Sequence, residues 1–198
     1  MCRLLTATQI ITWNDYGESH YVGPLYEAGI PQGASWYVSN NPHDAWRTLL
    51  PYYIDAYKSG NSSTTNTTIN ADKITYWYRP NPSNSGSSGG TTGNAVSQGQ
   101  QPLDPSLVSQ DKIFVTVLVR LPSVVTVQVG DGSTATLRAT HAGINHFSVP
   151  FDGQTGKVNF AIRRQGRTVA SASGPAITNT CDNGMVNWNA VVGSSDTS

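Results

Sequence analysis

Two acidic residues, Asp15 and Glu18, lie three positions apart within the segment TQIITWNDYGESHYVGP, residues 8–24. Ring-bearing side chains surround this pair in the sequence: Trp13, Tyr16, His20 and Tyr21. Two carboxyl groups can act as the acid and the base of glycoside hydrolysis, and flat rings can stack on sugar faces. The residue types and their spacing therefore indicate a candidate glycosidase site.

The distance between the two carboxyl groups bears on the mechanism. Inverting glycosidases hold them about 6.5–9.5 Å apart, which leaves room for a water molecule. Residues at positions i and i+3 of a turn can reach that separation, so Asp15 and Glu18 fit an inverting site. The acid has to stay protonated near the working pH, and we therefore expect it to be the more buried of the two.

Less specific interpretations of the same residues stay open. Both carboxylates could be exposed loop residues, the commonest position of acidic side chains, and His20 could be either a ligand contact or a packed loop residue. A histidine beside two carboxylates could also hold a metal, but no second histidine clusters with them, so we predict neither metal nor cofactor. Trp36 and Tyr37 fit either a sugar platform or core packing. We expect Phe147, Phe160 and Trp188 in the core.

A strand and a helix are expected to position the acidic pair. Residues 9–12 are rich in β-branched side chains and predict a short buried strand, with the polar cluster as the loop at its C-terminal end. Asn41 is the predicted N-cap of the helix, and Pro42 its first residue. Pro51 predicts a kink, and Gly60 lies just past the end. The predicted apolar stripe comprises Trp46, Leu49, Leu50, Tyr53, Ile54 and Tyr57.

The rest of the chain divides into two zones by composition. Residues 61–110 predict a connecting segment, with one strand over Lys73–Arg79 and a flexible Gly/Ser-rich linker over 83–101. Residues 111–198 predict an antiparallel β-sandwich domain, because short β-rich runs recur there between turn signals. The predicted strands are Ile113–Leu121, Val124–Val129, Thr134–Thr140, Asn145–Val149, Lys157–Arg163 and Arg167–Ala172.

Composition narrows the functional classes. The 198-residue chain has a formal net charge of zero and only 12% charged residues, against roughly 25% in an average soluble domain. This profile suits an extracellular monomer that handles neutral glycans, and the scattered basic residues argue against nucleic acid. No apolar run is long enough to predict a membrane span. Sequons at Asn61 and Asn66 favour secretion, although no signal peptide is recognisable, and the pairing of Cys2 with Cys181 stays open.

The stretch Ile11–Pro24, ITWNDYGESHYVGP, closely resembles the signature of the fungal α-1,3-glucanases, the mutanases of glycoside hydrolase family 71. The resemblance covers nearly the whole chain. It continues through HDAWR (43–47), LPYYIDAYKSG (50–60), YWYRP (76–80), AGI (142–144) and VPF (149–151). The first match is highly specific, whereas the motifs of the β-rich region are weaker.

The resemblance implies a (β/α)₈ barrel followed by a β-sandwich, and endo-hydrolysis of α-1,3-glucan by an inverting acid/base route. It implies that Asp15 and Glu18 are the catalytic carboxylates; of the two, we assign Glu18 as the general acid and Asp15 as the base or water-orienting group. The implied substrate-binding residues are Trp13, Asn14, Tyr16, His20 and Tyr21. The implied setting is a secreted or cell-wall enzyme, with α-1,3-glucan as its partner.

A complete barrel needs roughly 250 residues, and only one or two βα units fit into residues 1–60. We therefore expect an α+β fragment in which a remnant of the catalytic barrel (1–60) precedes the β-sandwich, the chain starting inside a larger protein. Ile10, Ile11 and the helix stripe are then expected to be exposed. The alternative is that the functional unit is a non-catalytic β-sandwich that acts as a glycan-binding or structural module.

Overall fold

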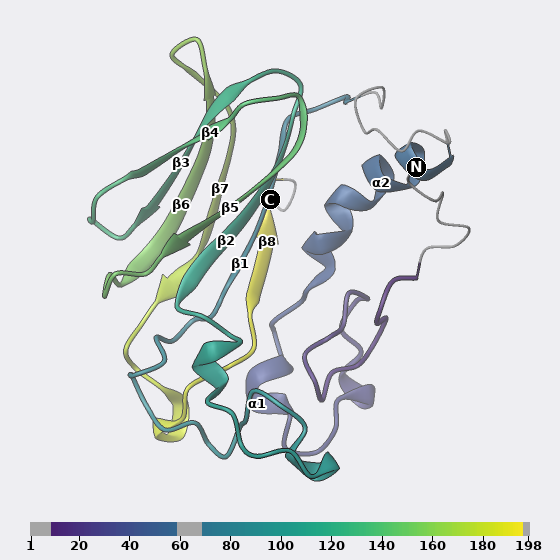
Figure 1. Cartoon of the computed structure of the whole chain (residues 1–198), viewed down its shortest axis with the longest axis vertical. Coiled ribbons are helices and arrows are strands. Elements are labelled where there is room, and N and C mark those ends of the chain that lie inside the picture. The colour runs from purple at the N-terminus through teal and green to yellow at the C-terminus, as the bar shows by residue number, and fades with distance from the viewer. Residues whose placement is uncertain (1–8, 59–68, 196–198) are drawn as a thin grey trace.

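A computed structural model describes residues 9–58 and 69–195 of the chain. Two antiparallel sheets of four strands each dominate the molecule (Figure 1). The strands are β1 (Lys73–Tyr78), β2 (Lys112–Val119), β3 (Ser123–Val129), β4 (Ala135–Ala139), β5 (Gly143–Pro150), β6 (Gly156–Arg164), β7 (Arg167–Ile177) and β8 (Val191–Ser194). The α-helices are α1 (Ser35–Val38) and α2 (Leu50–Lys58). The 3₁₀ turns are η1 (Glu27–Gly29), η2 (Asp44–Leu49), η4 (Val96–Gln98), η5 (Pro105–Leu107) and η6 (Asp182–Gly184).

The two sheets face each other and share one core. Their strand orders are β5-β2-β1-β8 and β4-β3-β6-β7. Alternating residues of both sheets enter the core, as the burial of Val125, Val127 and Val129 along β3 illustrates. Such alternation is the mark of a sheet with one buried face. The predicted antiparallel sandwich is confirmed, including all six strands expected between residues 113 and 172.

The first sheet begins earlier in the sequence than residue 111. β1, which the sequence placed in the connecting segment, pairs with β2 on one side and with β8 on the other. It is a central strand, and Ile74, Tyr76 and Tyr78 contribute buried side chains to the shared core. The sandwich therefore draws on residues 73–194 rather than on 111–198 alone.

The Gly/Ser-rich segment 83–101 packs against the C-terminal part of the chain. Ser87 N–H donates to Gly184 O (2.9 Å), and Val186 N–H donates back to Ser87 O (2.9 Å). Gly93 N–H donates to Leu103 O (2.8 Å) and closes a loop within the segment. Backbone hydrogen bonds thus hold a segment that was predicted to be a flexible loop or linker, although it contributes little apolar surface.

The predicted helix forms, but it is divided. The 3₁₀ turn η2 covers Asp44–Leu49 and α2 covers Leu50–Lys58, so the break falls next to Pro51, as predicted. The predicted N-cap is wrong, because His43, not Asn41, precedes the first helical turn. Proline lacks an N–H group and disturbs the preceding turn, which accounts for the change of helix type.

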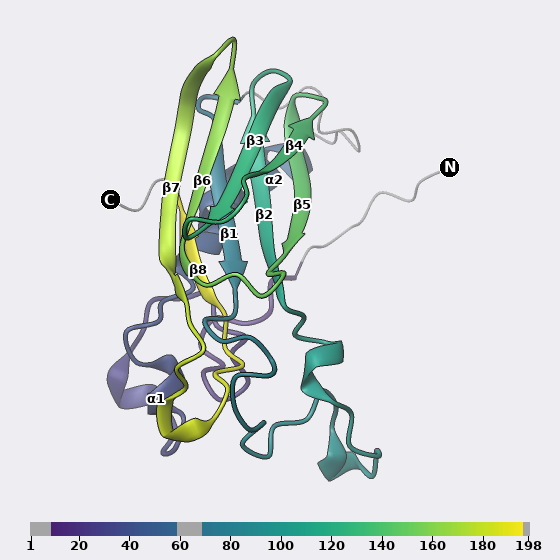
Figure 2. The ribbon, with the colours of Figure 1, turned by 90° about the vertical axis from the view of Figure 1, so that its left-hand side faces the viewer.

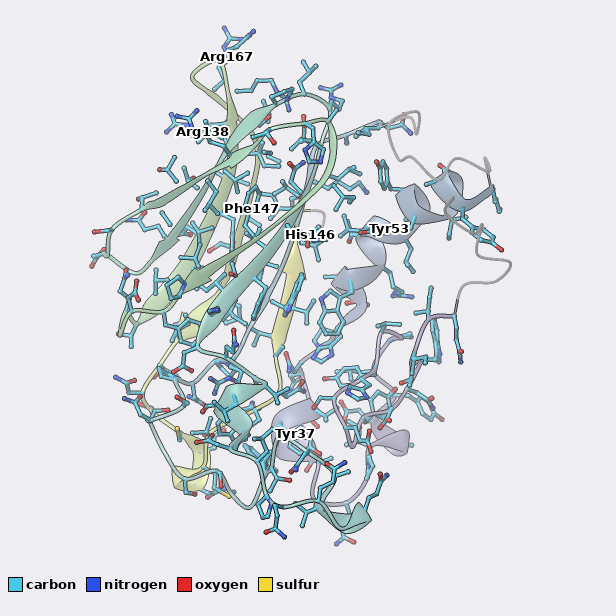
Figure 3. The ribbon with its side chains drawn as sticks, in the orientation of Figure 1. Tyr37, Tyr53, Arg138, His146, Phe147 and Arg167 are labelled. Carbon is cyan, nitrogen blue, oxygen red and sulfur yellow. The ribbon has the colours of Figure 1, made fainter. Side chains whose placement is uncertain are left out.

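The face that α2 buries differs from the predicted stripe. Leu49 and Tyr52 pack against Leu118 of β2, on the outer side of the first sheet. Figure 2 shows α2 behind the two sheets, on the side away from β3, β4, β6 and β7. Tyr53 and Ile54, both in the predicted stripe, are exposed, and Figure 3 shows Tyr53 on α2.

The short run before the acidic pair is not the predicted buried strand. Residues 9–12 have no strand assignment, and Ile10 and Ile11 are 54% and 66% exposed. The expected exposure of Ile10 and Ile11 is confirmed. The expected exposure of the whole helix stripe is confirmed only for Tyr53, Ile54 and Tyr57, because Leu49 is buried and Trp46 and Leu50 are half-buried. A β-branched run forms a strand only where a partner strand is available, and none of the described strands lies beside it.

Three other features bear on the sequence-based expectations. Cys2 and the two sequons lie outside the described residues, while Cys181 is half-buried with its Sγ 3.2 Å from Ser85 Oγ. Phe160 is buried and Phe147 packs against the core, as predicted. Within the described ranges, no helix has the length and apolar character needed to cross a lipid bilayer.

Gly143, at the start of β5, allows α2 to approach the sheet. Its φ is +103°, and a Cβ atom there would lie 2.9 Å from Tyr52 Oη. Gly143→Ala is expected to lower the free energy of unfolding by about 2 kcal/mol, because alanine meets both backbone strain and this contact. Thermal unfolding measures the loss. Gly166→Ala is the matched control, because Gly166 has a similar positive φ of +77° but open space around it. An equal loss in both variants would show that the approach of Tyr52 to Gly143 does not contribute to the loss.

Candidate active site

The acidic pair lies on a loop that backbone hydrogen bonds close into a hairpin-like turn, which we call the acidic loop (residues 12–23). Thr12 N–H donates to His20 O (3.0 Å), and Gly23 N–H donates to Trp13 O (2.8 Å). A Cβ atom at Gly23 would lie 2.6 Å from Trp13 O, so the two sides of the loop approach too closely for a larger residue. The loop holds its shape through these contacts without a flanking strand.

Asp15 is tied to the backbone of the acidic loop. Its N–H donates to Thr12 Oγ1 (3.0 Å), and its Oδ1 accepts the N–H of Glu18 (3.1 Å). This is the side-chain-to-backbone turn that aspartate favours in loops. Asp15 is thus a half-buried carboxylate in a fixed position.

Glu18 is the more exposed member of the pair. Its side chain is 75% exposed, and its Oε2 lies 3.7 Å from Nδ1 of His20, whose side chain is 60% exposed. The expectation that the acid is the more buried carboxyl group does not match Glu18, because Asp15 is the less exposed of the two. Burial alone would assign the acid to Asp15, contrary to our assignment of Glu18.

Asp15, Glu18 and His20 come close together. One potential ligand atom of each lies within 4.8 Å of the others. The two carboxylates are therefore closer than the roughly 6.5–9.5 Å typical of inverting enzymes. The cluster has the donor types of a cation site, but two of its three side chains are exposed, and exposed acidic groups often gather without a metal.

The rings beside the acidic pair divide into packed and exposed ones. Tyr16 and Tyr21 are 3% and 0% exposed, and their edge-to-face contact builds a small core under the acidic loop. Trp13 and Asn14 are exposed, and the Arg47 guanidinium lies 5.6 Å from the Trp13 ring centre. Tyr16 and Tyr21 thus support the loop, whereas Trp13, Asn14 and His20 remain accessible to a ligand.

A cavity of about 720 Å³, which we call the main cavity, opens beside the acidic loop. This volume lies within the usual range for ligand sites. Glu18 and His20 are on its wall, whereas Asp15 is not part of the described lining. The other lining residues are Gly17, Ser19, Trp36, Tyr37, the segment 91–98, Trp188 and Asn189.

Three aromatic residues from distant parts of the sequence meet at the main cavity: Trp36, Tyr37 and Trp188. Trp36 and Tyr37 line the cavity, as a ligand platform would, while Tyr37 also packs against the small core of Tyr16 and Tyr21. Figure 3 shows Tyr37 on α1. The expectation that Trp188 is a core residue is wrong, because it is half-buried and lines the cavity. Its position between Asn187 and Asn189 was the available signal, since asparagines on both sides indicate a loop.

A buried polar network joins the acidic loop to the sandwich. Tyr21 Oη donates to Asn41 O (2.7 Å) and accepts from Asn189 Nδ2 (3.0 Å). The Tyr21 ring stacks on His43, with ring centres 3.9 Å apart. Burial raises the pKa of Tyr21 to about 12, so this hydroxyl remains a donor at any working pH. The acidic loop and the segment before β8 are therefore held in a fixed relation.

His43 makes the network sensitive to acid. The side chain is fully buried, its Nε2 lies 2.9 Å from Ala190 O, and burial lowers its pKa from 6.5 to about 4. Between these pH values the unfolded chain binds the proton and the folded chain does not. The free energy of unfolding is therefore expected to be unaffected above pH 6.5 and to fall by about 3 kcal/mol as the pH drops to 4.

Denaturant unfolding at stepped pH values measures this loss. His43→Gln should flatten the dependence, whereas His141→Gln, at an exposed histidine, should leave it unchanged. A parent chain with equal stability at pH 6.5 and pH 4 would contradict the expectation.

Comparisons with known proteins show the family of this chain. The model of glycosyl hydrolase family 71 matches residues 5–198. A mutanase of Penicillium rubens is 36% identical over 187 residues, which cover 94% of this chain and 38% of the relative. A glucan endo-1,3-alpha-glucosidase of Schizosaccharomyces pombe is 37% identical over 185 residues, 93% of this chain and 40% of the relative.

A shorter similarity links the chain to an ascus wall endo-1,3-alpha-glucanase of Schizosaccharomyces pombe, 31% identical over 80 residues, 38% of this chain and 18% of the relative. No solved structure matches the chain significantly. The chain spans 38–40% of the length of the first two relatives. Because the family model matches nearly all of its residues, this chain belongs to glycosyl hydrolase family 71.

Proposed function

We propose that this chain forms part of a glycoside hydrolase that cleaves α-1,3-glucan within the polymer. Membership of the family supports the reaction class, and the names of the two longest-matching relatives support the substrate. The observation that carries the proposal is the main cavity, where Glu18 and His20 share a wall with three aromatic side chains. A carboxyl group beside flat rings suits sugar binding and proton transfer, and Asp15 in the same loop supplies the second carboxyl group that the reaction needs.

The two carboxylates are suited to different roles in an inverting reaction. Hydrogen bonds to the backbone and to Thr12 hold Asp15 in place. As the oxygen of the attacking water bonds to the anomeric carbon, Asp15 can accept a proton from that water. Glu18, exposed on the cavity wall, can give its proton to the leaving oxygen as the glycosidic bond breaks. Rotation of the exposed Glu18 side chain away from His20 would widen the separation to the range that admits a water. Bound glucan would also shield Glu18 from solvent.

We also propose that residues 1–60, of which the structure describes 9–58, are a remnant of a catalytic barrel. Apolar side chains are exposed on both parts of this region, as Ile11 before the acidic loop and Tyr53 and Tyr57 on α2 show. Soluble proteins seldom expose contiguous apolar surface without a partner for it. Further strands and helices of a longer protein would cover these residues.

The reaction can be tested with insoluble α-1,3-glucan as the substrate. We expect the protein to release new reducing ends, and the first products to carry the β-anomeric configuration, because inversion converts an α-linkage into a β-product. Reducing-sugar assay and proton NMR during the first minutes measure both. Retention of the α-configuration would overturn the inverting mechanism, and no release from a full-length relative would overturn the proposed activity.

The alternative function, a non-catalytic glycan-binding or structural sandwich, is favoured by one observation: Trp188 of the sandwich segment lines the main cavity. Because β1 is a central strand, this alternative has to be tested on the whole chain. Retention on α-1,3-glucan with no hydrolysis would support it. For either function we propose a secreted or cell-wall monomer, consistent with the low charge content and with the ascus wall relative.

A further inference from the structure

Trp188 borders two neighbouring cavities. The second cavity, of about 580 Å³, shares Thr91, Thr92 and Trp188 with the main cavity. The main cavity carries Glu18, and the second cavity carries Asp104 as its charged lining residue among those described. The surface that runs from Glu18 past Trp188 is therefore largely uncharged and polar, which suits a neutral sugar chain.

One face of the Trp188 ring is covered from the protein interior. The Arg79 guanidinium lies 4.5 Å from the ring centre, and Arg79 itself is only 2% exposed. The indole Nε1 donates to Ser88 O (3.2 Å), which fixes the rotation of the ring. Arg79 covers one face of the Trp188 ring, and the hydrogen bond to Ser88 uses its Nε1 edge. The remaining, accessible part of the ring is free to contact a ligand.

Arg79 is held so firmly that it can position the ring. It forms an ion pair with Asp111, and its Nη1 donates to Asn81 O (3.2 Å). Asp111 also accepts hydrogen bonds from the N–H and the hydroxyl of Ser83 (3.0 Å and 2.8 Å). This network places Trp188 without using any residue of the acidic loop.

The next residue along the chain fixes the distance between Trp188 and the acidic loop. Asn189 is 2% exposed, and its Nδ2 donates both to Tyr21 Oη (3.0 Å) and to Tyr37 O (2.8 Å). Of these two adjacent residues, Trp188 places its ring at the cavity and Asn189 holds the acidic loop. The segment before β8 and the acidic loop thus form two sides of the main cavity.

We infer that Trp188 is a sugar-stacking platform, at which glucosyl units of an α-1,3-linked chain bind as the chain passes from the main cavity toward the second cavity. Arg79 is its positioning residue. This inference rests on the proposed function and deepens it, because a platform beyond the carboxylates would hold a polymer on both sides of a bond within it. The sandwich then contributes directly to substrate binding.

Retention of the whole chain on insoluble α-1,3-glucan tests the inference, in a Glu18→Gln background that separates binding from hydrolysis. Trp188→Ala is expected to weaken binding about tenfold, the loss of a stacking contact of about 1.4 kcal/mol. Trp188→Phe, which keeps a flat ring, should bind within about threefold of the parent. Trp77→Ala is the matched control, because Trp77 is a half-buried ring on β1 outside both cavities.

A folded Trp188→Ala chain that binds like its parent would overturn the platform. Should that variant not fold, oxidation of the parent chain by N-bromosuccinimide decides: α-1,3-linked gluco-oligosaccharides should protect Trp188 and not Trp77, and equal oxidation with and without sugar overturns the inference. The proposed hydrolysis fails separately, if Glu18→Gln leaves the release of reducing ends unchanged.

Discussion

Replacing Glu18 with glutamine is expected to lower the rate of α-1,3-glucan hydrolysis by about 10²–10⁴-fold, the usual contribution of a general acid or base. Glutamine keeps the size of the side chain on the wall of the main cavity but has no proton to give. The same loss is expected for Asp15→Asn, whose side-chain oxygen can still accept the Glu18 N–H and so preserve the loop. Each change therefore removes a proton-transferring carboxyl group and leaves the shape of the acidic loop in place.

Initial rates of reducing-end release measure both losses, in this chain and at the matching positions of a full-length relative. Glu27→Gln provides the control, because Glu27 is an exposed carboxylate outside the main cavity. Parent-like rates in both Asp15→Asn and Glu18→Gln would remove the catalytic assignment. A loss in only one would show which carboxylate acts and would refute the paired mechanism.

The largest loss of stability is expected from Asp111→Ala. The Arg79 guanidinium, 2% exposed, would be left without its counter-charge, and Ser83 N–H would lose its acceptor. Breaking a buried ion pair from one side costs about 3–5 kcal/mol, and the lower end applies because the Asp111 side chain is 36% exposed and water can replace part of it. A loss of about 3 kcal/mol corresponds to a fall of roughly 6–12 °C in Tm for a domain of this size.

Thermal unfolding followed by circular dichroism checks this expectation. Asp44→Ala is the matched control, since it removes an exposed pair with Arg47 at 3.4 Å and should cost at most about 1 kcal/mol. Equal losses in the two variants would mean that the Arg79–Asp111 pair stabilises the fold no more than a surface ion pair does. Tryptophan emission of the Asp111→Ala chain should also shift, because Trp188 loses the ordered cation on its face.

The sandwich could be predicted from the sequence because its signal is local. β3 alternates buried and half-buried residues from Ser123 to Val129, and turn residues such as Gly166 separate the strands. The buried face of α2 could not be predicted in the same way. Tyr52 and Tyr53 are adjacent residues of the same type, but only Tyr52 is buried, because Leu118 of the distant strand β2 lies beneath it. Helical spacing identifies a helix, but the position of the sheet decides which face it buries.

Only part of the candidate site could be predicted from the sequence, because the rest depends on contacts between distant segments. The composition of residues 8–24 indicated the acidic loop, and Glu18 and His20 do reach a cavity wall. Trp188 was misplaced because the cavity joins segments far apart in the chain, as the hydrogen bond between Asn189 and Tyr21 across 168 positions shows. The ordered segment 83–101 escaped prediction because backbone hydrogen bonds, which composition does not report, hold it.

The pairing of β1 with β8 has a consequence for synthesis in the cell. Tyr76 lies opposite Gly193, so one edge of a central strand receives its partner from a segment far along the chain. Until β8 has emerged from the ribosome, that edge carries unpaired backbone groups that can bind other nascent strands. Chaperones that shield extended segments should therefore associate with the nascent polypeptide until β8 is available.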